Sequence, residues 1–547
     1  MKTEKRRRVI VLILACLFTL MQLTGWQISM RYGTSVHRNA FFQNIGMLSG
    51  IQLVFAAFFE AAFWYAVIDV SFYLLGGQGR SRHLKRRKYD NEKMGISERR
   101  IWILAGSGLF FCLFVGLLAC WPGIYAYDAQ GQLAQAMYPE VEYATHHPLL
   151  HTLIMGKIIT FGYHVFKGNL GAGVLIYSII QMLVCTVIFT YSICFIWTVT
   201  KRKWLAATAF LYYAFFPTVV LFTFCTTKDV LCSAFLHLMV ILIYEMYQDT
   251  DSFFVQKKKA VLLIFSGVLM CLFRNNGIYA MALMTIFAGA LFPKRRRLAC
   301  IIFLPIMLLS FLSDRGLQAV LHAEISSMAE AFSVPIQQIA RVYNEEGEEA
   351  FTEEELGLIY QAVSAEVLLG YQPMISDDVK YAIQFNEEVV THKGEYVRLW
   401  MNTGVRNPKE YILSFLDNTY QAWYPGTCIT RYPERSESDY LDIEGFDTVE
   451  KEPKIQWLYD IYHKIATEFS YQKIPGLRLL FSVGAMFWVV LFTWFYSIWK
   501  KDSGIMAALL MILCFCATCF LGPTVLVRYY LNLFYIFPVC IAFLAGR

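Results

Sequence analysis

The feature that most constrains this chain is a series of apolar stretches, each long enough to cross a membrane. A spanning helix needs roughly 20 apolar residues to cross about 30 Å of hydrocarbon, because its backbone polar groups must be satisfied within the helix. We predict twelve spans, near residues 9–29, 45–76, 101–121, 170–199, 204–223, 229–247, 259–274, 277–293, 298–313, 477–499, 504–522 and 527–546. Hydrophobic residues make up 57% of the chain and charged residues 16%, which excludes an ordinary soluble enzyme. The expected fold is an all-α polytopic membrane protein.

The basic residues predict the orientation of these spans. They cluster at 5–8, 80–100, 201–203, 257–259, 294–297 and 500–501. Twelve spans with a cytoplasmic amino terminus place every cluster, and the carboxyl terminus, on the cytoplasmic side. Residues 149–167 are also apolar, but counting them as a span would invert every later loop. We therefore expect them to form a helix that lies along the membrane surface.

The first apolar stretch begins like a signal peptide, with a basic start and an apolar run. Residues 27–31 offer no small-residue cleavage pattern, so we expect an uncleaved anchor.

Charge divides the chain into four predicted parts. These are a two-span extension with a basic loop at 1–100, a transmembrane core at 101–313 with a long outer loop at 122–169, a polar segment at 314–476, and carboxyl-terminal spans at 477–547. Segment 314–476 holds 28 acidic and 13 basic residues, net −15, so the remainder is +21. It predicts a helix-rich extracytoplasmic domain between spans nine and ten. Because the positive charge lies in short loops, no nucleic-acid partner is expected.

Two features of the chain invite a metal-site interpretation. The acidic run 344–356 lacks EF-hand spacing, and a solvated helical face is the better interpretation. Cys514, Cys516 and Cys519 lie inside a predicted span, where they pack as small apolar residues. Cys428 is the one cysteine in the polar segment, so no disulfide framework is possible there. We assign no metal and no cofactor.

Asp128 is the first candidate for chemistry, because it follows the third span closely in the motif YAYDAQGQ. A partly desolvated carboxylate at a membrane surface has a raised pKa, which suits a general base. The alternative is that Asp128 caps a short helix at 129–138. Residue type alone favours neither interpretation.

Other polar motifs lie on the same predicted outer face. They are HHP with His146 and His147, TTKD with Lys228 and Asp229, FRNNG with Arg274, Asn275 and Asn276, and VRYY with Arg528 and Tyr529. Adjacent histidines point apart, so surface or capping roles remain open for that pair. The three cations could together hold a lipid phosphate, with arginine supplying forked hydrogen bonds. Each alone could equally be an anchor at the end of a span.

The order of these features resembles the GT-C class of membrane glycosyltransferases, which take sugars from polyprenyl-phosphate carriers. In that class an acidic residue in the first outer loop follows the first core span, and two helices lie along the membrane in that loop, which Asp128 and residues 129–138 and 149–167 match. More narrowly, the chain resembles a bacterial multi-span family related to those enzymes, over about residues 101–547, in the motifs YAYDAQGQ, HHPLLH, TTKD, FRNNG, VPIQQIARV and VRYYL. The GT-C loop often carries DD or DE where Asp128 stands alone, so the resemblance gives no support to a metal-dependent reaction.

The resemblance implies an inverting glycosyltransferase in the bacterial cell membrane. Asp128 would be the base that deprotonates the acceptor, and Lys228, Arg274 and Arg528 would bind the donor phosphate. His146, His147, Asp229, Asn275, Asn276 and Tyr529 would contact substrate. The acceptor would be a glycan, lipid or protein of the envelope, and Trp400, Trp423 and Tyr424 offer faces on which a sugar could pack, although core positions are the commoner role for such residues.

Two other classes of function fit parts of the pattern. A transporter or lipid flippase also has many spans with polar residues, but it places charges near the bilayer midplane and often shows repeated halves. The charged candidates here gather at one face, and no internal repeat is evident. A non-catalytic envelope scaffold is the third possibility.

Overall fold

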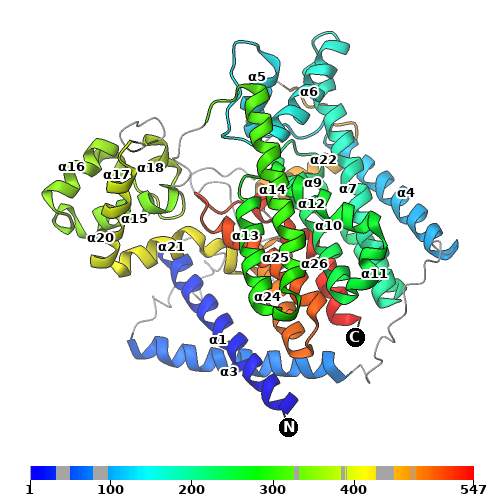
Figure 1. The fold of residues 1–547 in the computed structure, drawn as a ribbon, viewed down its shortest axis with the longest axis horizontal. Coiled ribbons are helices and arrows are strands. Elements are labelled where there is room, and N and C mark those ends of the chain that lie inside the picture. Colours follow the sequence, from blue (N-terminus) through cyan, green and yellow to red (C-terminus); the bar gives the residue numbers. More distant parts are fainter. Residues whose placement is uncertain are drawn as a thin grey trace.

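The computed structural model describes residues 2–32, 50–77, 96–325, 332–383, 389, 391–426, 449–469, 471, 474 and 476–546. These residues form helices joined by short loops, and within them β-structure is limited to isolated bridges. Cys428 and most of the basic cluster at 80–100 lie outside the described residues. Figure 1 shows a helical bundle with a separate helical lobe beside it.

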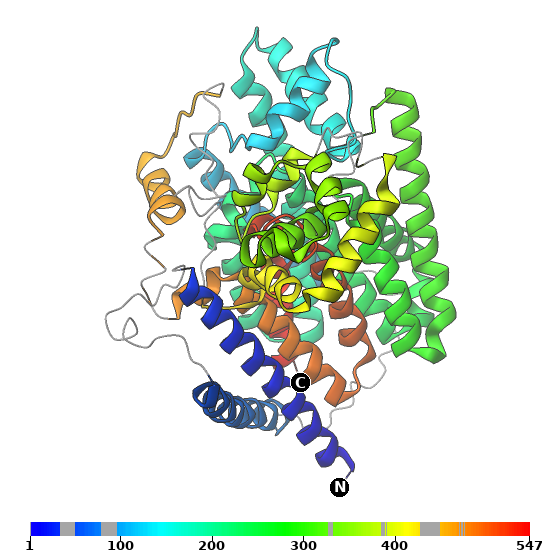
Figure 2. The same cartoon turned by 90° about the vertical axis from the view of Figure 1, so that its left-hand side faces the viewer.

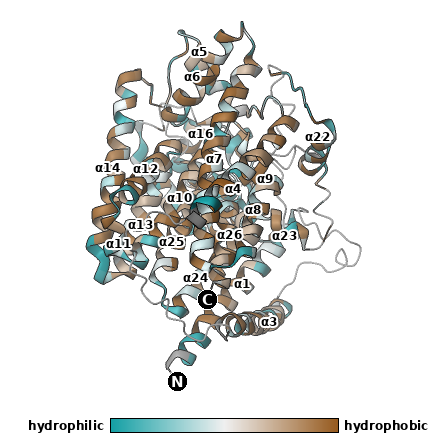
Figure 3. Cartoon of the chain, turned by 90° about the vertical axis from the view of Figure 1, so that its right-hand side faces the viewer, coloured by the Kyte–Doolittle hydropathy of each residue, from teal (hydrophilic) through white to brown (hydrophobic). Residues whose placement is uncertain are grey.

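The bundle contains most of the apolar helices. Its members are α4 (Ile96–Ala119), α7 (Leu170–Thr200), α8 (Lys203–Phe215), α9 (Pro217–Thr223), α10 (Lys228–Gln248), α12 (Lys257–Phe273), α13 (Gly277–Leu291), α14 (Arg296–Leu321), α24 (Val483–Lys500), α25 (Ser503–Cys519) and α26 (Leu531–Ala545). α10 lies at the centre, since nearly all of its side chains are buried against α7, α12, α25 and α26. Apolar residues cover much of α12, α13 and α14, as Figure 3 shows.

Helix length supports the predicted polytopic membrane fold. Among the described residues, eight helices are long and apolar enough to cross a membrane, or nine if the bent pair α8 and α9 forms one span. α13 and α25 are apolar but shorter. α6 (Leu149–Val165), which was predicted to lie along the surface, is not among the candidate spans. It packs with α5 (Tyr127–Met137) at the end of the bundle opposite the two termini (Figure 1).

Four of the predicted basic clusters lie at the same end of the bundle, namely 5–8, 257–259, 294–297 and 500–501. Arg6 donates to the carbonyl of Ile498 at 2.7 Å, and Lys259 pairs with Glu245 at 2.8 Å. Arg295 donates to the carbonyl of Tyr247 in the last turn of α10. Lys228 begins α10, whose 21 residues place it roughly 30 Å from this basic end.

The amino-terminal helices lie against the outside of this bundle. α1 (Lys2–Arg31) packs along α24, and α3 (Gly50–Gly77) crosses α1 near its start. Figure 1 shows α3 running across the base of the bundle, and Figure 2 views it along its axis. Arg7 of α1 pairs with Asp69 of α3 at 3.2 Å. Both helices are long and apolar enough to cross a membrane.

The described residues between 332 and 423 of the polar segment form a helical lobe with its own core, whereas residues 314–321 belong to α14 and α22 (Gln456–His463) packs on α4. The helices of the lobe are α15 (Ser333–Glu346), α16 (Glu353–Ala362), α17 (Ala365–Leu369), α18 (Asp377–Ala382), α20 (Lys393–Arg406) and α21 (Pro408–Trp423). Arg341 is buried between Glu410 at 2.8 Å and Asp417 at 2.6 Å. The acidic run before α16 is largely exposed, and Thr352 and Glu355 form a capping box there. Trp423 and Tyr424 are buried core residues, so they offer no open face to a sugar.

The lobe also contacts the turn that leads into the last bundle helix. The amide of Ser376 donates to the carbonyl of Pro523 at 2.9 Å, and Asn418 Nδ2 donates to the carbonyl of Gly522 at 3.1 Å. Ile375 and Thr524 form an antiparallel bridge. The lobe therefore holds the segment that ends in the VRYY motif.

Candidate functional site

The segment before Asp128 is joined to the segment before Lys228. Ile124 and Cys225 form a parallel bridge, in which the amide of Thr226 donates to the carbonyl of Ile124 at 2.9 Å. α5 and α10 each begin three residues beyond this bridge (127 − 124 and 228 − 225). The bridge therefore sets the first turns of the two helices side by side.

Asp128 lies in the first turn of α5 and forms ion pairs rather than a cap. The N-cap position belongs to Ala126, and no side chain caps the helix, so the capping alternative is wrong. Lys228 Nζ lies 3.2 Å from Asp128 Oδ2, and Arg528 Nη1 donates to the same oxygen at 2.8 Å. The Asp128 side chain is 13% exposed and that of Arg528 is 6% exposed. A shielded carboxylate thus bridges two cations.

A second acid extends this arrangement to the third cation. Asp229 pairs with Arg274, and its other oxygen lies 3.8 Å from Arg528 Nε. The Arg274 guanidinium stacks over the Tyr529 ring, 4.2 Å from its centroid. We call Asp128, Asp229, Lys228, Arg274 and Arg528 the ion cluster. Its three cations exceed its two carboxylates by one charge, which favours an anionic ligand.

Lys228 stands where a cation is unfavourable for the helix itself. A helix amino terminus carries a partial positive charge, so a lysine at the first position of α10 is destabilising unless an acid compensates it. Asp229 in the same turn and Asp128 from another helix supply that compensation. Lys228 Nζ also donates to His147 Nδ1 at 3.0 Å. Two neighbours therefore fix the ammonium in a position that helix stability does not explain.

The cations determine the ionisation of Asp128. Burial alone raises a carboxyl pKa, but the charges of Arg528 and Lys228 outweigh it and hold the pKa of Asp128 well below 3.8. The expectation of a raised pKa is therefore wrong in direction. Burial and the charge of Lys228 also hold the pKa of His147 well below 6.5, so this imidazole is neutral at pH 7. Because its Nδ1 accepts from Lys228, its proton resides on Nε2.

Beneath the ion cluster lies a buried polar network that the sequence did not single out. His151 is fully buried, although it belongs to the helix that was predicted to lie along the membrane surface. Its Nδ1 lies 3.1 Å from Gln132 Oε1 of α5, and its Nε2 lies 3.0 Å from the Tyr177 hydroxyl of α7. Burial lowers the pKa of His151 to about 3. Gln181 continues the network by donating to the carbonyl of Cys225 at 2.8 Å, and this bond fixes the extended segment that precedes Lys228.

The remaining predicted substrate residues lie at different places around the ion cluster. Asn275 is exposed and donates to the carbonyl of Thr145 at 3.4 Å. Asn276 instead donates to Thr518 Oγ1 at 2.9 Å, so it fastens the turn to α25 and is not part of the ion cluster. His146 is exposed and meets the edge of the His147 ring.

A small pocket lies beside the ion cluster, and sequence reasoning missed most of its lining. It encloses about 220 Å³ between the carboxyl-terminal end of α14, the loop before α6 and the turn after α12. Its lining comprises Thr145, His147, Leu149, Asn275, Asp314, Arg315, Gln318 and Ile325. The spacing of Asp314 and Gln318, four residues apart at a helix end, was the available signal, but the predicted span ended at 313.

The cluster does not fit a divalent metal. The oxygens of Asp128 and Asp229 face cations, and no group of three His, Cys, Asp or Glu side chains in the described part of the chain could hold a metal ion. We therefore derive no step through a metal.

The comparison with sequence families identifies the chain only at the family level. The family model described as "Family of unknown function (DUF6020)" matches residues 137–546. The chain belongs to this family. The DUF6020 match includes the three cations of the ion cluster, whereas Asp128 lies ahead of it. No curated protein and no solved structure matches the chain.

Proposed function

We propose that this DUF6020 protein is a membrane glycosyltransferase that moves a sugar from a polyprenyl-phosphate carrier to an acceptor of the bacterial cell envelope. One observation carries the proposal. Three cations, Lys228, Arg274 and Arg528, lie together with the carboxylates of Asp128 and Asp229 next to a polar pocket, and Asp128 pairs with two of them. A phosphate-leaving reaction with an alcohol nucleophile needs this combination of charge clamp, acid–base group and binding space.

The membrane arrangement belongs to the same proposal. Twelve spans with both termini in the cytoplasm would place the four basic clusters at one end of the bundle inside the cell and the ion cluster outside. The bundle would then correspond to a GT-C-like core, and the lobe would face outward. Asp128 follows α4 with only the turn at 120–126 between them, so the acid would lie close to the outer membrane surface.

Arg274 and Arg528 would bind the phosphate of the donor lipid, and Lys228 would contribute a third positive charge. Arginine can form paired hydrogen bonds with phosphate oxygens. Both guanidinium groups lie over the Tyr529 ring, which helps to hold them in place. The acceptor oxygen would attack the anomeric carbon, the bond from that carbon to the phosphate oxygen would break, and the lipid phosphate would leave with the electron pair. The configuration at the anomeric carbon would invert.

Because its pKa is low, Asp128 would have two successive roles, one before and one after the donor binds. Before the donor binds, its carboxylate balances Lys228 and Arg528. A bound phosphate would take over some of those hydrogen bonds, and the added negative charge would raise the pKa of Asp128. The carboxylate would then be free to accept the acceptor proton. Donor binding would thus activate the base, because only the complex contains enough negative charge to release it.

Sugar transfer tests this proposal directly. Purified protein would be incubated with polyprenyl-phosphate hexoses and envelope fractions, and transfer would be followed by mass spectrometry. Asp128→Asn and Arg274→Lys should each lower the rate by a factor on the order of 100, because each removes a group that acts on the reacting centre. Asp251→Asn and Arg297→Lys are matched controls, since both side chains are exposed at the basic end of the bundle.

Two results would contradict the proposal. One is the absence of sugar transfer from every donor by folded wild-type protein, and the other is a wild-type rate in Asp128→Asn. A flippase would instead move lipid across vesicle membranes without forming a glycosidic bond, and the same preparations can be assayed for that movement.

A further inference from the structure

The pocket beside the ion cluster is formed by three separate segments. Asp314 and Gln318 lie four residues apart on α14, so they share a helix face. Asn275 enters from the turn between α12 and α13. The segment around Thr145 closes a third side, because Ala144 and Glu324 form a parallel bridge and the amide of Thr145 donates to the carbonyl of Glu324 at 3.0 Å.

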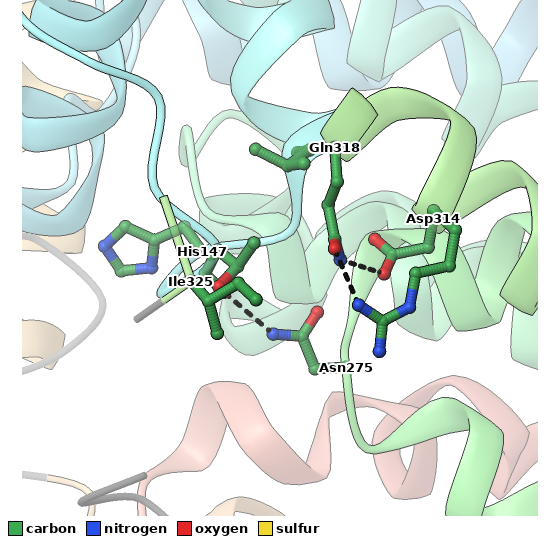
Figure 4. Close-up of a pocket in the computed structure, with 8 residues that line it drawn as sticks. His147, Asn275, Asp314, Gln318 and Ile325 are labelled. Atoms are coloured by element: carbon green, nitrogen blue, oxygen red, sulfur yellow. Dashed lines mark hydrogen bonds between the residues drawn. The ribbon is translucent and has the colours of Figure 1, made fainter. Parts of the chain in front are cut away.

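The polar lining groups are already oriented by one another. Gln318 Nε2 donates to Asp314 Oδ2 at 2.7 Å, and Arg315 Nη1 donates to Gln318 Oε1 at 3.0 Å (Figure 4). Asn275 Nδ2 donates to the carbonyl of Thr145. The pocket therefore has side chains held in defined positions, and these groups have further lone pairs and N–H bonds to offer a ligand.

Two residues connect the pocket to the ion cluster. His147 contributes to the pocket wall, while its ring points away from Asp314 and Gln318 in Figure 4 and accepts from Lys228. Asn275 follows directly after Arg274 in the chain. Because His147 both lines the pocket and contacts Lys228, the substituent of a phosphate held by the ion cluster would lie next to this pocket.

The lining specifies the class of ligand. One carboxylate and one guanidinium leave the pocket without net charge, and two amides add both donors and acceptors. Leu149 and Ile325 supply apolar surface. A volume of about 220 Å³ lies below the range of about 300–1,000 Å³ that is typical of drug-sized ligands, so the pocket fits one ring rather than a lipid chain or an oligosaccharide. Alternating hydroxyl and C–H groups on a compact ring match this lining.

We propose that this pocket binds one neutral sugar ring, with Asp314, Gln318 and Asn275 as the residues that recognise its hydroxyl groups. The charges of Asp314 and Arg315 already balance, so a sugar carboxylate would add an uncompensated negative charge to the lining and is disfavoured. The sugar has two possible sources, the lipid-linked donor and a saccharide acceptor. Assignment to the donor rests on the proposed function, whereas recognition of a neutral sugar ring does not.

Direct binding to the full-length protein in detergent tests the pocket without requiring turnover. Dissociation constants would be measured for neryl phosphate, neryl phosphate glucose, neryl phosphate glucuronate and free methyl glucoside. The proteins would be the wild type, Gln318→Leu, Asp314→Asn and the control Gln256→Leu at the basic end of the bundle. Gel filtration and melting temperature would establish that each variant is folded.

If the pocket binds the donor sugar, neryl phosphate glucose should bind about tenfold more tightly than neryl phosphate to the wild type and to Gln256→Leu. That gain should be lost in Gln318→Leu and Asp314→Asn, while binding of neryl phosphate alone stays unchanged. For an acceptor sugar, methyl glucoside binding should be weakened by the same two variants. The inference is overturned if both variants keep every sugar-dependent gain, or if glucuronate binds as tightly as glucose.

A further arm separates this inference from the proposed function. Arg528→Met should abolish neryl phosphate binding if the ion cluster holds phosphate. Unchanged neryl phosphate binding in Arg528→Met would count against the glycosyltransferase, and sugar binding that still depends on Gln318 would leave the pocket assignment standing.

Discussion

Removal of Arg528 should destabilise the protein chiefly by leaving Asp128 under-compensated. At 2.8 Å and an effective dielectric constant of about 20, the attraction between these two charges is about 6 kcal/mol. Desolvation of the two ions offsets most of that gain, so the pair itself has a small net value. Loss of one partner is more costly, about 3–5 kcal/mol, because the other charge stays buried. Lys228 at 3.2 Å still faces Asp128, so we expect about 3 kcal/mol for Arg528→Met.

A double-mutant cycle measures this coupling. Arg528→Met, Asp128→Asn and the double variant would be unfolded in mixed detergent micelles, with tryptophan fluorescence reporting the free energy of unfolding. The double variant should lose less stability than the sum of the single losses, by roughly 1–3 kcal/mol, because its asparagine carries no charge. The distant pair Arg528→Met and Asp251→Asn should be additive. Additivity of the Asp128 and Arg528 losses would refute the direct ion pair and the geometry of the ion cluster built on it.

The remaining predictions concern Asp128 of the ion cluster and the buried His151. The depressed pKa of Asp128 contributes stability above the unfolded value near 3.9, and that contribution is lost as the pH falls through the lower folded value. Wild type should therefore lose more unfolding free energy than Asp128→Asn between pH 7 and pH 3, and equal losses would show that Asp128 is not ionised by its neighbours. His151→Leu should lose about 1–3 kcal/mol of unfolding free energy at pH 7, because it removes the buried partner of Gln132 Oε1 and one of the two partners of the Tyr177 hydroxyl. A His151→Leu variant as stable as the wild type would place the histidine outside that network.

The sequence alone determined where the helices and the charged motifs lie along the chain. Hydrocarbon excludes charge, so apolar stretches near 20 residues predicted helices, and the cations of TTKD, FRNNG and VRYY were predicted at helix ends. The structure places Lys228 at the first position of α10, Arg274 just after α12, and Arg528 just before α26. The alternation of basic clusters also left no room for a span at 149–167, and α6, which forms there, is not among the candidate spans.

Only the tertiary structure decided how those residues affect one another. Arg528 is 400 positions from Asp128, and their contact reverses the direction in which burial alone would shift the Asp128 pKa. The pocket, too, joins α14 to two distant turns, and the burial of His151 depends on packing between α5, α6 and α7. The physical reason is that local sequence sets helix length and polarity, whereas a pKa or a binding pocket depends on charges and surfaces that packing brings within a few ångströms.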